Sequence, residues 1–404
     1  VREAIMYRLT SHTLSKSMIR ASILRQISLF AVLAATSAFA QSGGAPTRIS
    51  PTEIDAHLRF LSSDLLEGRA PATRGGRLAE EYIASQLKAF GVQPGVGDSS
   101  YFQRVPIDVV KADPNTINVT ASGKANAKLR FTNDVVVWPG SATEASSAHG
   151  ELVFVGYGAS APEYKWDDFK GADVRGKVLL VLVNDPPAPP SEPNLFGGKA
   201  MTYYGRWTYK YEEAERRGAA GMLIVHTTER AGYPWHVVVN SNSTEHRLLP
   251  RDHPPASGHP LPAPIGVRGW ITDSAATALL AQAGLNMVQL RKQAESRDFR
   301  PVSTGIIIDA SMKNSVSRLS ANNVVGVVRG NDPKLRNQYV LYSAHWDHFG
   351  IGPVVNGDSI YNGAVDNGSG VASVLTIAHA AATGPKPRRS QLFVFVTAEE
   401  SGLL

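Results

Sequence analysis

Three short polar phrases between residues 343 and 404 contain the side chains best suited to chemistry. They carry His345 and Asp347, then Asp366 within a glycine-rich stretch, then the pair Glu399 and Glu400. Imidazole and carboxylate groups, with no cysteine in the chain, are typical of sites for zinc, manganese or cobalt. Asp347 is spaced to accept a hydrogen bond from the second ring nitrogen of His345. Asp366 has two oxygens with which to bridge two ions.

The neighbouring elements are expected to bring these phrases to one edge of a sheet. Residues 339–342 and 392–396 are apolar runs that predict buried strands, and residues 371–378 have helical spacing before a glycine–proline stop. Such a strand, helix and strand form a parallel crossover unit, and open α/β sheets place their sites beyond the carboxyl ends of the strands. On an extended chain Glu399 and Glu400 would diverge, so one could bind metal while the other acts on water.

Together the phrases resemble the zinc-dependent aminopeptidases with two co-catalytic metal ions, in the subset with an inserted protease-associated domain. All three occur in the family's order, and the resemblance extends over nearly all of the chain after its leader. It implies that His345 and Glu400 each bind one zinc ion and that Asp366 bridges both ions. Asp347 would orient His345, and Glu399 would be the general base. Peptides would be the substrates.

One departure from the family concerns ligands beyond the glutamate pair. The family's site needs a further Asp and a further His after that phrase, whereas the sequence stops at Leu404. We therefore expect three of five ligands here, weak metal binding, and little or no activity from this polypeptide alone. An active purified preparation would contradict this expectation. His348 is interpreted as an ordinary loop histidine, and Asn367 as an unmodified sequon residue, because a glycan there would block the site.

The resemblance implies an α/β fold: a three-layer αβα zinc-exopeptidase domain with a mixed, mostly parallel sheet, interrupted by a β-rich protease-associated domain. A chain of 404 residues is long enough for two domains. We assign residues 1–40 to a leader and signal peptide and residues 41–105 to the first part of the peptidase domain. Residues 106–300 would be the insert, and residues 301–404 the catalytic part, which is incomplete by comparison with the family.

Local signals predict the elements of both domains. A capping box at residues 50–53 opens a helix that would bury Leu61 and Leu65, and a second helix would follow Gly76 and bury Leu78. A further helix is expected over residues 209–217. Apolar runs bounded by turn residues predict strands, which we place at residues 152–158, 176–183, 221–226, 305–309 and 323–328.

Several polar and aromatic residues outside the three phrases are interpreted as structural. Arg69 and Arg74, in a stretch that resembles the family's opening, are taken as scaffold. The loop histidines, His246, His253 and His259, lack a carboxylate partner at ligand-like spacing and are taken as exposed. The aromatic cluster between Tyr203 and Tyr211 could contact substrate or pack between the two domains.

The beginning of the chain predicts export. Basic residues precede an apolar run at residues 27–35 and an Ala-Phe-Ala phrase that ends at Ala40, and the run is too short to span a bilayer. Cleavage near Ala40 would give a secreted or periplasmic bacterial protein with no stable membrane anchor. The absence of cysteine excludes disulfides and suits a periplasm. Residues 1–40 contribute +4 of the formal net charge of +6, so the charge gives no argument for a nucleic-acid partner.

The residues leave other functions open. A carboxypeptidase and a glutaminyl cyclase could use the same scaffold, although the Asp-Asn-Gly-Ser-Gly and Ala-Glu-Glu phrases favour a peptidase over the cyclase. A non-catalytic binding protein that kept the scaffold is the alternative from another class. The intact His345, Asp366, Glu399 and Glu400 argue against a decayed site.

Overall fold

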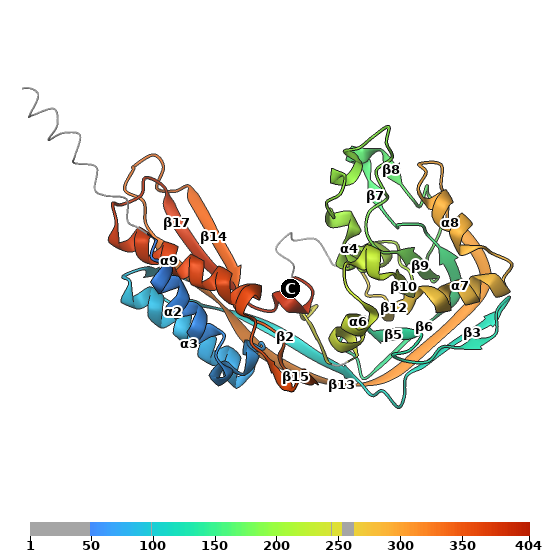
Figure 1. Cartoon of the computed structure of the whole chain (residues 1–404), viewed down its shortest axis with the longest axis horizontal. Coiled ribbons are helices and arrows are strands. Elements are labelled where there is room, and N and C mark those ends of the chain that lie inside the picture. The colour runs from blue at the N-terminus through green and yellow to red at the C-terminus, as the bar shows by residue number, and fades with distance from the viewer. Residues whose placement is uncertain (1–48, 98, 244, 253–261) are drawn as a thin grey trace, which may run out of the picture.

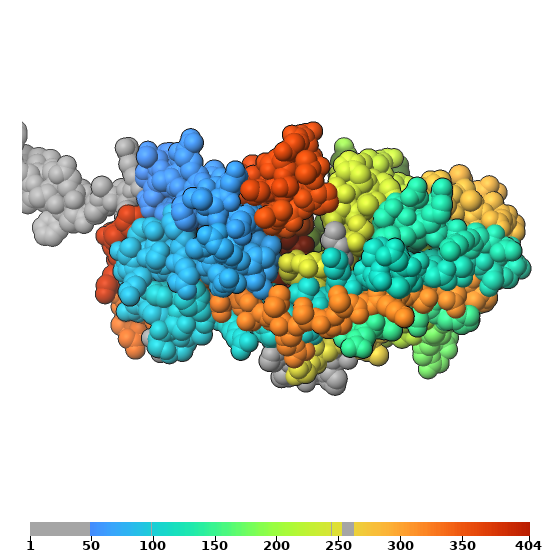
Figure 2. Space-filling model, turned by 90° about the horizontal axis from the view of Figure 1, so that it is seen from below, coloured from blue at the N-terminus to red at the C-terminus, as the bar shows by residue number. Residues whose placement is uncertain are grey.

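One strand of 27 residues, β13 (Val302–Val328), runs through both lobes of the computed structural model (Figure 1). Seen from below, its residues form a band along the surface that joins the lobes (Figure 2). The structure describes residues 49–97, 99–243, 245–252 and 262–404. The predicted signal peptide, His253 and His259 lie outside these ranges.

The prediction of two separate strands at 305–309 and 323–328 was wrong, because both are parts of β13. The residues between them are mostly polar, and those at 315–319 are exposed, so no apolar run marks them as strand. They are nevertheless extended because Asn314–Val324 pairs antiparallel with β2 (Phe102–Ala112). Backbone hydrogen bonds to a neighbouring strand therefore hold this segment, without help from an apolar pattern.

The first lobe packs helices against the end of β13 and two further strands. Strand β17 (Ser390–Val396) lies between β13, to which it is antiparallel, and β14 (Tyr339–His345), to which it is parallel. Phe393, Phe395 and Trp346 are fully buried in this core. The helices of this lobe are α2 (Pro51–Leu61), α3 (Arg74–Ala89) and α9 (Ser369–Thr383). Its smaller strands are β1 (Gln93–Pro94), β15 (Gly350–Val355) and β16 (Asp358–Tyr361).

Helix starts follow the predicted capping chemistry. The Ser50 side chain accepts the backbone N–H of Glu53 at 3.3 Å and caps α2, as the capping box predicts. Thr73 accepts the N–H of Gly76 at 3.2 Å and caps α3, which therefore begins slightly earlier than expected. Helix α9 covers the predicted helix at 371–378 and ends beside the glycine–proline stop.

Three predictions of burial in this lobe were wrong. Leu65 is 70% exposed because it lies beyond the end of α2, in the 3-10 turn η1 (Asp64–Arg69). Leu78 is 39% exposed, because the buried face of α3 includes the next residue, Ala79, and not Leu78. The apolar residues at 339–341 are exposed as well, since β14 pairs only with β17 among the described residues. β14 is therefore an edge strand in this part of the chain.

The second lobe contains a sheet in the order β6-β9-β10-β12-β5, with a parallel run from β6 to β12. Strand β10 (Gly221–His226) matches its predicted range, β9 (Val178–Leu182) lies within its predicted range, and β6 (Ala145–Phe154) begins before its predicted range. The other strands of this lobe are β3 (Asn118–Gly123), β4 (Ala127–Lys128), β5 (Val135–Pro139), β7 (Ser160–Ala161), β8 (Trp166–Asp167) and β12 (Val267–Thr272). Strand β11 (Glu245–Leu248) instead pairs antiparallel with β2.

Helices lie on both faces of this sheet (Figure 1). They are α4 (Trp207–Arg216), α5 (Thr228–Ala231), α6 (Trp235–Asn242), α7 (Asp273–Gln282) and α8 (Met287–Ala294), of which α4 corresponds to the predicted helix at 209–217. The predicted α/β class with a mixed sheet is confirmed. The boundaries of the insert at 106 and 300 stay a prediction. Within the described residues, no helix combines the length and the apolar character needed to cross a bilayer.

Candidate metal centre

Strands β14 and β17 bring two of the three phrases to the same edge of the sheet. They are parallel neighbours, and His345, the last residue of β14, is in register with Val396, the last residue of β17. Glu399 and Glu400 follow β17 in the 3-10 turn η6 (Glu399–Ser401). Both phrases therefore leave the sheet at the carboxyl ends of parallel strands, which is the expected place for a site.

Asp366 reaches this edge from the turn η5 (Ala364–Gly368), which precedes α9. Gly363 opens the turn with a φ of 59°. A Cβ atom at Gly363 would lie 2.6 Å from the ring of His348 and 2.7 Å from Arg69 Nη2, so only glycine fits there. Close approach of the backbone at Gly363 thus lets the turn deliver Asp366 beside His345.

The side chains of His345, Asp366 and Glu400 converge at this edge. Each offers one ligand atom, and these atoms lie within 4.8 Å of one another. His345 Nε2 lies 3.1 Å from Asp366 Oδ1. The His345 side chain is 9% exposed and that of Asp366 70% exposed, so the cluster opens toward solvent on the aspartate side. The structure therefore brings together the three residues that the sequence nominated as ligands.

Glu399 lies at the rim of this cluster, outside the group of three. Its Oε2 is 3.6 Å from His345 Nε2, and its side chain is 34% exposed. Partial burial raises the pKa of Glu399 above the ordinary value of a glutamate, while the nearby His345 opposes the rise. The two adjacent glutamates point to different partners, because Glu400 Oε1 lies 2.5 Å from His348 Nδ1.

Asp347 has a different arrangement from the one expected. Its fully buried carboxylate accepts the backbone N–H groups of Glu399 at 3.2 Å and Glu400 at 3.3 Å. Burial raises the pKa of Asp347 to about 6. His345 Nδ1 lies 3.2 Å from the main-chain carbonyl oxygen of Asp347 and 3.8 Å from its carboxylate. The carbonyl is thus the closer acceptor for the imidazole, and the carboxylate holds the glutamate turn.

Sequence reasoning missed two residues of this site. His348, interpreted as an ordinary loop histidine, contacts Glu400, and the only signal for it was its place three residues after His345. Arg69, interpreted as scaffold, is 1% exposed and contacts the main chain beside His345 and before Asp366. The signal for it was its place in the stretch that resembles the family's opening, but its hydrogen-bond partners include residues 277 to 294 positions away, which local sequence does not predict.

The second lobe approaches the same site through the start of α4. A Cβ atom on Gly402 would lie 3.1 Å from Trp207 Cη2, and Gly402 has a φ of 102°. Trp207 therefore lies against the turn that carries both glutamates. Packing between the lobes is one of the two roles considered for the aromatic cluster, and Trp207 has this role. Tyr209 and Tyr211, from the same cluster, are buried inside the second lobe.

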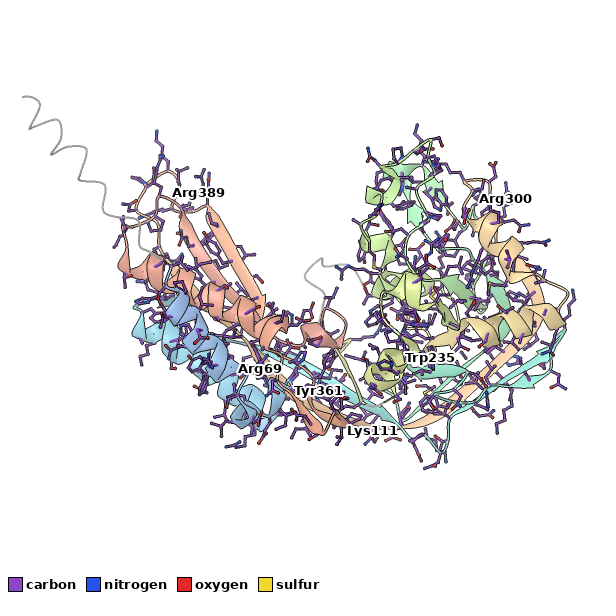
Figure 3. All side chains as sticks on the ribbon, in the orientation of Figure 1. Arg69, Lys111, Trp235, Arg300, Tyr361 and Arg389 are labelled. Carbon is purple, nitrogen blue, oxygen red and sulfur yellow. The ribbon has the colours of Figure 1, made fainter. Side chains whose placement is uncertain are left out.

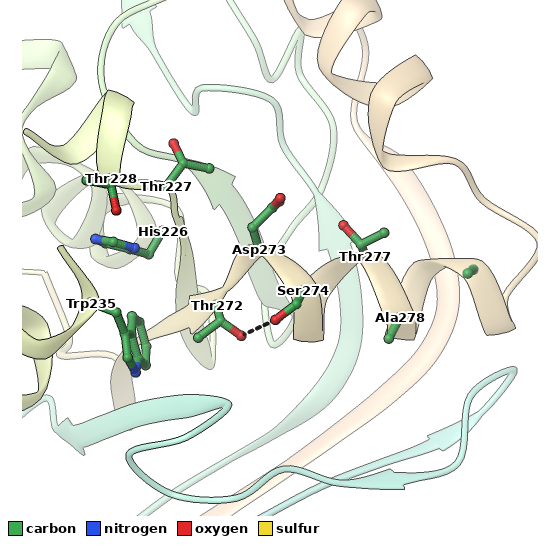
Figure 4. A pocket seen from close by; sticks show the side chains of 10 residues that line it. His226, Thr227, Thr228, Trp235, Thr272, Asp273, Ser274, Thr277 and Ala278 are labelled. Carbon is green, nitrogen blue, oxygen red and sulfur yellow. Dashed lines mark hydrogen bonds between the residues drawn. The ribbon is translucent and has the colours of Figure 1, made fainter.

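A separate cleft of about 750 Å³ lies in the second lobe, at the carboxyl ends of β10 and β12 (Figure 4). Its lining includes His226, Trp235 and Asp273, and the hydroxyl oxygens of Thr272 and Ser274 lie 3.2 Å apart. His226 Nε2 contacts the carbonyl oxygen of Tyr233 at 2.9 Å. None of the residues that line this cleft belongs to the metal cluster.

Comparisons with known proteins agree with the chemistry of the first lobe. Residues 323–404, which contain all three phrases, match the model of peptidase family M28, and this match confirms the predicted resemblance for that segment. No curated protein matches the chain.

Solved structures with similarity to the chain include an aminopeptidase from Aneurinibacillus sp. strain AM-1, with 20% sequence identity and a TM-score of 0.45. The alignment covers 88% of this chain and 65% of that one. BSAP, a zinc aminopeptidase from Bacillus subtilis, has 18% identity and a TM-score of 0.39, with 89% of this chain and 64% of BSAP covered. A peptidase M28 precursor from Shewanella amazonensis SB2B has 18% identity and a TM-score of 0.39, with 86% and 67% covered. This chain thus spans about two thirds of their length.

Proposed function

We propose that this chain, whose residues 323–404 match peptidase family M28, is an exported zinc metallopeptidase that removes N-terminal residues from peptides. The observation that supports this proposal most directly is the convergence of His345, Asp366 and Glu400 within that segment. Export is proposed from the signal-like pattern that ends at Ala40.

The donor set fits zinc. One imidazole nitrogen and two carboxylate oxygens are ligands that zinc accepts, and three protein ligands leave a position for water. The contact between His345 Nδ1 and the carbonyl oxygen of Asp347 places the ring proton on Nδ1. His345 Nε2 faces Asp366 and Glu399 and is the ring nitrogen that would bind the ion. The imidazole is therefore oriented as a metal ligand requires.

The three described ligands lie close enough together to serve one shared centre. By resemblance, Asp366 would bridge two zinc ions, and the two remaining ligands, an Asp and a His, follow the glutamate pair in the family. We propose two ions for the complete centre on this basis, with His345 and Glu400 each on a different ion. The exposed side of Asp366 is the side on which a second ion could approach.

Glu399 is placed to move protons. A bound zinc ion would supply a water of lowered pKa and polarise the scissile carbonyl. Glu399 lies beside the ligand cluster, with its carboxylate 3.6 Å from His345 Nε2, and can accept a proton from a water at this position. Its pKa is raised and so lies closer to neutral pH than that of an ordinary glutamate, which favours passing that proton on to the leaving amine.

Hydrolysis of matched substrates tests this function. The complete gene product would be assayed, with and without chelator, on peptides that have a free N-terminus and on peptides blocked there. We expect zinc-dependent release of N-terminal residues, and a loss of roughly 10²- to 10⁴-fold in Glu399→Gln with zinc binding retained. Glu81→Gln, which changes an exposed glutamate of α3, is the matched control.

The outcomes separate the rival functions. Release of C-terminal residues from N-blocked peptides would replace the proposal with a carboxypeptidase. Zinc binding without hydrolysis of either series would favour a non-catalytic binding protein. Full activity in Glu399→Gln would contradict the assigned base.

A further inference from the structure

Arg69 is a buried arginine in the first lobe (Figure 3). Its guanidinium donates hydrogen bonds to four main-chain carbonyl oxygens and is 1% exposed. Nε donates to Trp346 at 2.9 Å, Nη1 to Asn362 at 2.6 Å and also to Leu61, and Nη2 to Gly363 at 3.0 Å. Its hydrogen-bond acceptors among the described residues are thus main-chain oxygens, so the side chain connects backbone segments.

The carbonyl of Leu61 ends α2, and the other three belong to two of the segments that carry metal ligands. Trp346 immediately follows His345, and Gly363 opens the turn that carries Asp366. The carbonyl oxygen of Arg69 itself accepts the N–H of His348 at 3.3 Å. A single residue therefore connects the exit of β14 with the turn before α9, and these are the segments that must lie at a fixed separation for His345 and Asp366 to face each other.

The turn that carries Arg69 is itself held closely against the first lobe. Gly68 has a φ of 68°, and a Cβ atom there would lie 2.5 Å from the carbonyl oxygen of Gly350 and 2.6 Å from that of Tyr361. Arg69 is thus anchored at its main chain as well as at its guanidinium. A rigid residue of this kind can transmit its own position to the segments that it contacts.

The charge of Arg69 also bears on the cluster. Burial lowers the pKa of Arg69 to about 10, against the attraction of Asp347 and Glu400, so the guanidinium stays protonated at neutral pH. It is a buried cation that the carboxylates of Asp347 and Glu400 attract.

We propose that Arg69 is a positioning residue of the metal centre, which holds the main chain at Trp346 and Gly363 so that His345 and Asp366 reach the same ion. The inference rests on the proposed function in one respect, namely that the cluster binds zinc. A guanidinium suits this role because its planar donors can satisfy several carbonyls at once, whereas a lysine ammonium acts as a point charge.

Zinc affinity separates a positioning role from general structural support. The complete gene product would be titrated with zinc against a chromophoric chelator, as wild type, Arg69→Met and Arg69→Lys. Removal of a partner behind metal ligands typically costs 10- to 100-fold in metal affinity. We expect a loss of about that size in Arg69→Met and partial recovery in Arg69→Lys, which keeps the charge and some donors.

Two controls match Arg69 in burial and in place. Lys210 is also fully buried, and its Nζ donates to the carbonyl oxygens of Tyr157 at 2.5 Å and Asn184 at 3.1 Å in the second lobe. Lys210→Met should lower the melting temperature without lowering zinc affinity. Arg74 is an exposed arginine near the turn that carries Arg69, and it pairs with Glu67. Arg74→Met should change neither the melting temperature nor the zinc affinity.

A milder variant keeps the test decisive if Arg69→Met does not fold. Asn362 Nδ2 donates to the carbonyl oxygen of Ser62 at 2.9 Å and to Asp64 at 2.8 Å. Asn362→Ala therefore loosens the segment that leads into the turn carrying Asp366, while leaving Arg69 in place. A smaller loss of zinc affinity is expected there.

Unchanged zinc affinity in a folded Arg69 variant and in Asn362→Ala would overturn the positioning role. An equal loss in Lys210→Met would overturn it as well, by showing that affinity follows general stability. Failure of the wild type to bind zinc would instead overturn the proposed function, so the two failures are distinguishable.

Discussion

The buried carboxylate of Asp347 accepts the backbone N–H of Glu399 at 3.2 Å, across 52 positions of sequence. It also accepts the N–H of Glu400 at 3.3 Å. Through these bonds, the loop that follows β14 fixes the turn that follows β17. Asp347 thereby places the proposed general base and one ligand relative to His345, which lies two residues before it.

Substitution of Asp347 by asparagine should disturb that turn. The amide oxygen can still accept a hydrogen bond, but its negative charge is lost, and the new NH₂ group is left buried without an assured acceptor. We expect a loss of about 1–3 kcal/mol in the free energy of unfolding, together with weaker zinc binding. Urea unfolding and zinc titration measure the two effects. Unchanged values for both would show that the carboxylate holds neither the turn nor the site.

His348 should matter to the metal centre through Glu400. Its Nδ1 lies 2.5 Å from Glu400 Oε1, so His348→Ala removes a hydrogen-bond partner of a proposed ligand. A fall of about 10- to 100-fold in zinc affinity is expected. His149→Ala is the control, because His149 is an exposed histidine that also lies beside a carboxylate, that of Asp309 at 3.1 Å. Equal affinities in the two variants would restore the interpretation of His348 as an ordinary loop residue.

The parts of the site that the sequence predicted are those encoded by neighbouring residues. His345 ends a strand and Glu399 follows one, so local apolar runs were enough to place both at one sheet edge. Asp366 was nominated by the glycines around it, and Gly363 indeed has the positive φ that such a turn needs. At these residues, the side chains suited to bind metal and the signals for local backbone structure lie close together in the sequence.

What the sequence did not predict depends on contacts between distant segments. Arg69 donates a hydrogen bond to the carbonyl oxygen of Gly363, 294 positions away, and the residues around Arg69 do not predict that contact. The middle of β13 lacks an apolar pattern, yet it is extended because it pairs with β2. The apolar run of β14 is exposed because β14 pairs with β17 on one side only among the described residues. In each case tertiary structure overrides the local pattern.

The core beneath the site should be sensitive to truncation. Phe395 is fully buried in β17, one residue before Val396, where the strand ends and the chain leads to the glutamates. Phe395→Ala is expected to cost about 3–5 kcal/mol in the free energy of unfolding, because a cavity remains where the ring was. Val288→Ala, at a position that is 74% exposed on α8, should change stability by no more than about 0.5 kcal/mol. Similar losses in the two variants would contradict the assigned core.

Acid sensitivity should depend on His226 in the second lobe. Burial lowers the pKa of His226 below its ordinary value, so the unfolded chain takes up a proton there more readily than the folded protein does. The stability from this residue is present above about pH 6.5 and is lost as pH falls, by at most about 1.4 kcal/mol per pH unit. Urea unfolding at about pH 7.5 and about pH 5.5 should show a smaller decrease in His226→Gln than in wild type. An equal decrease would exclude His226 as a source.

X-ray absorption at the zinc edge tests the central claim most directly, because it identifies the ligands of the ion. The complete gene product would be loaded with zinc as wild type and as His345→Ala. We predict nitrogen and oxygen neighbours at about 2.0–2.2 Å, with the scattering signature of an imidazole in wild type and its loss, or loss of the zinc itself, in His345→Ala. A wild type that binds no zinc, or an identical spectrum from the His345→Ala protein, would contradict the assignment of His345, Asp366 and Glu400 as a metal centre.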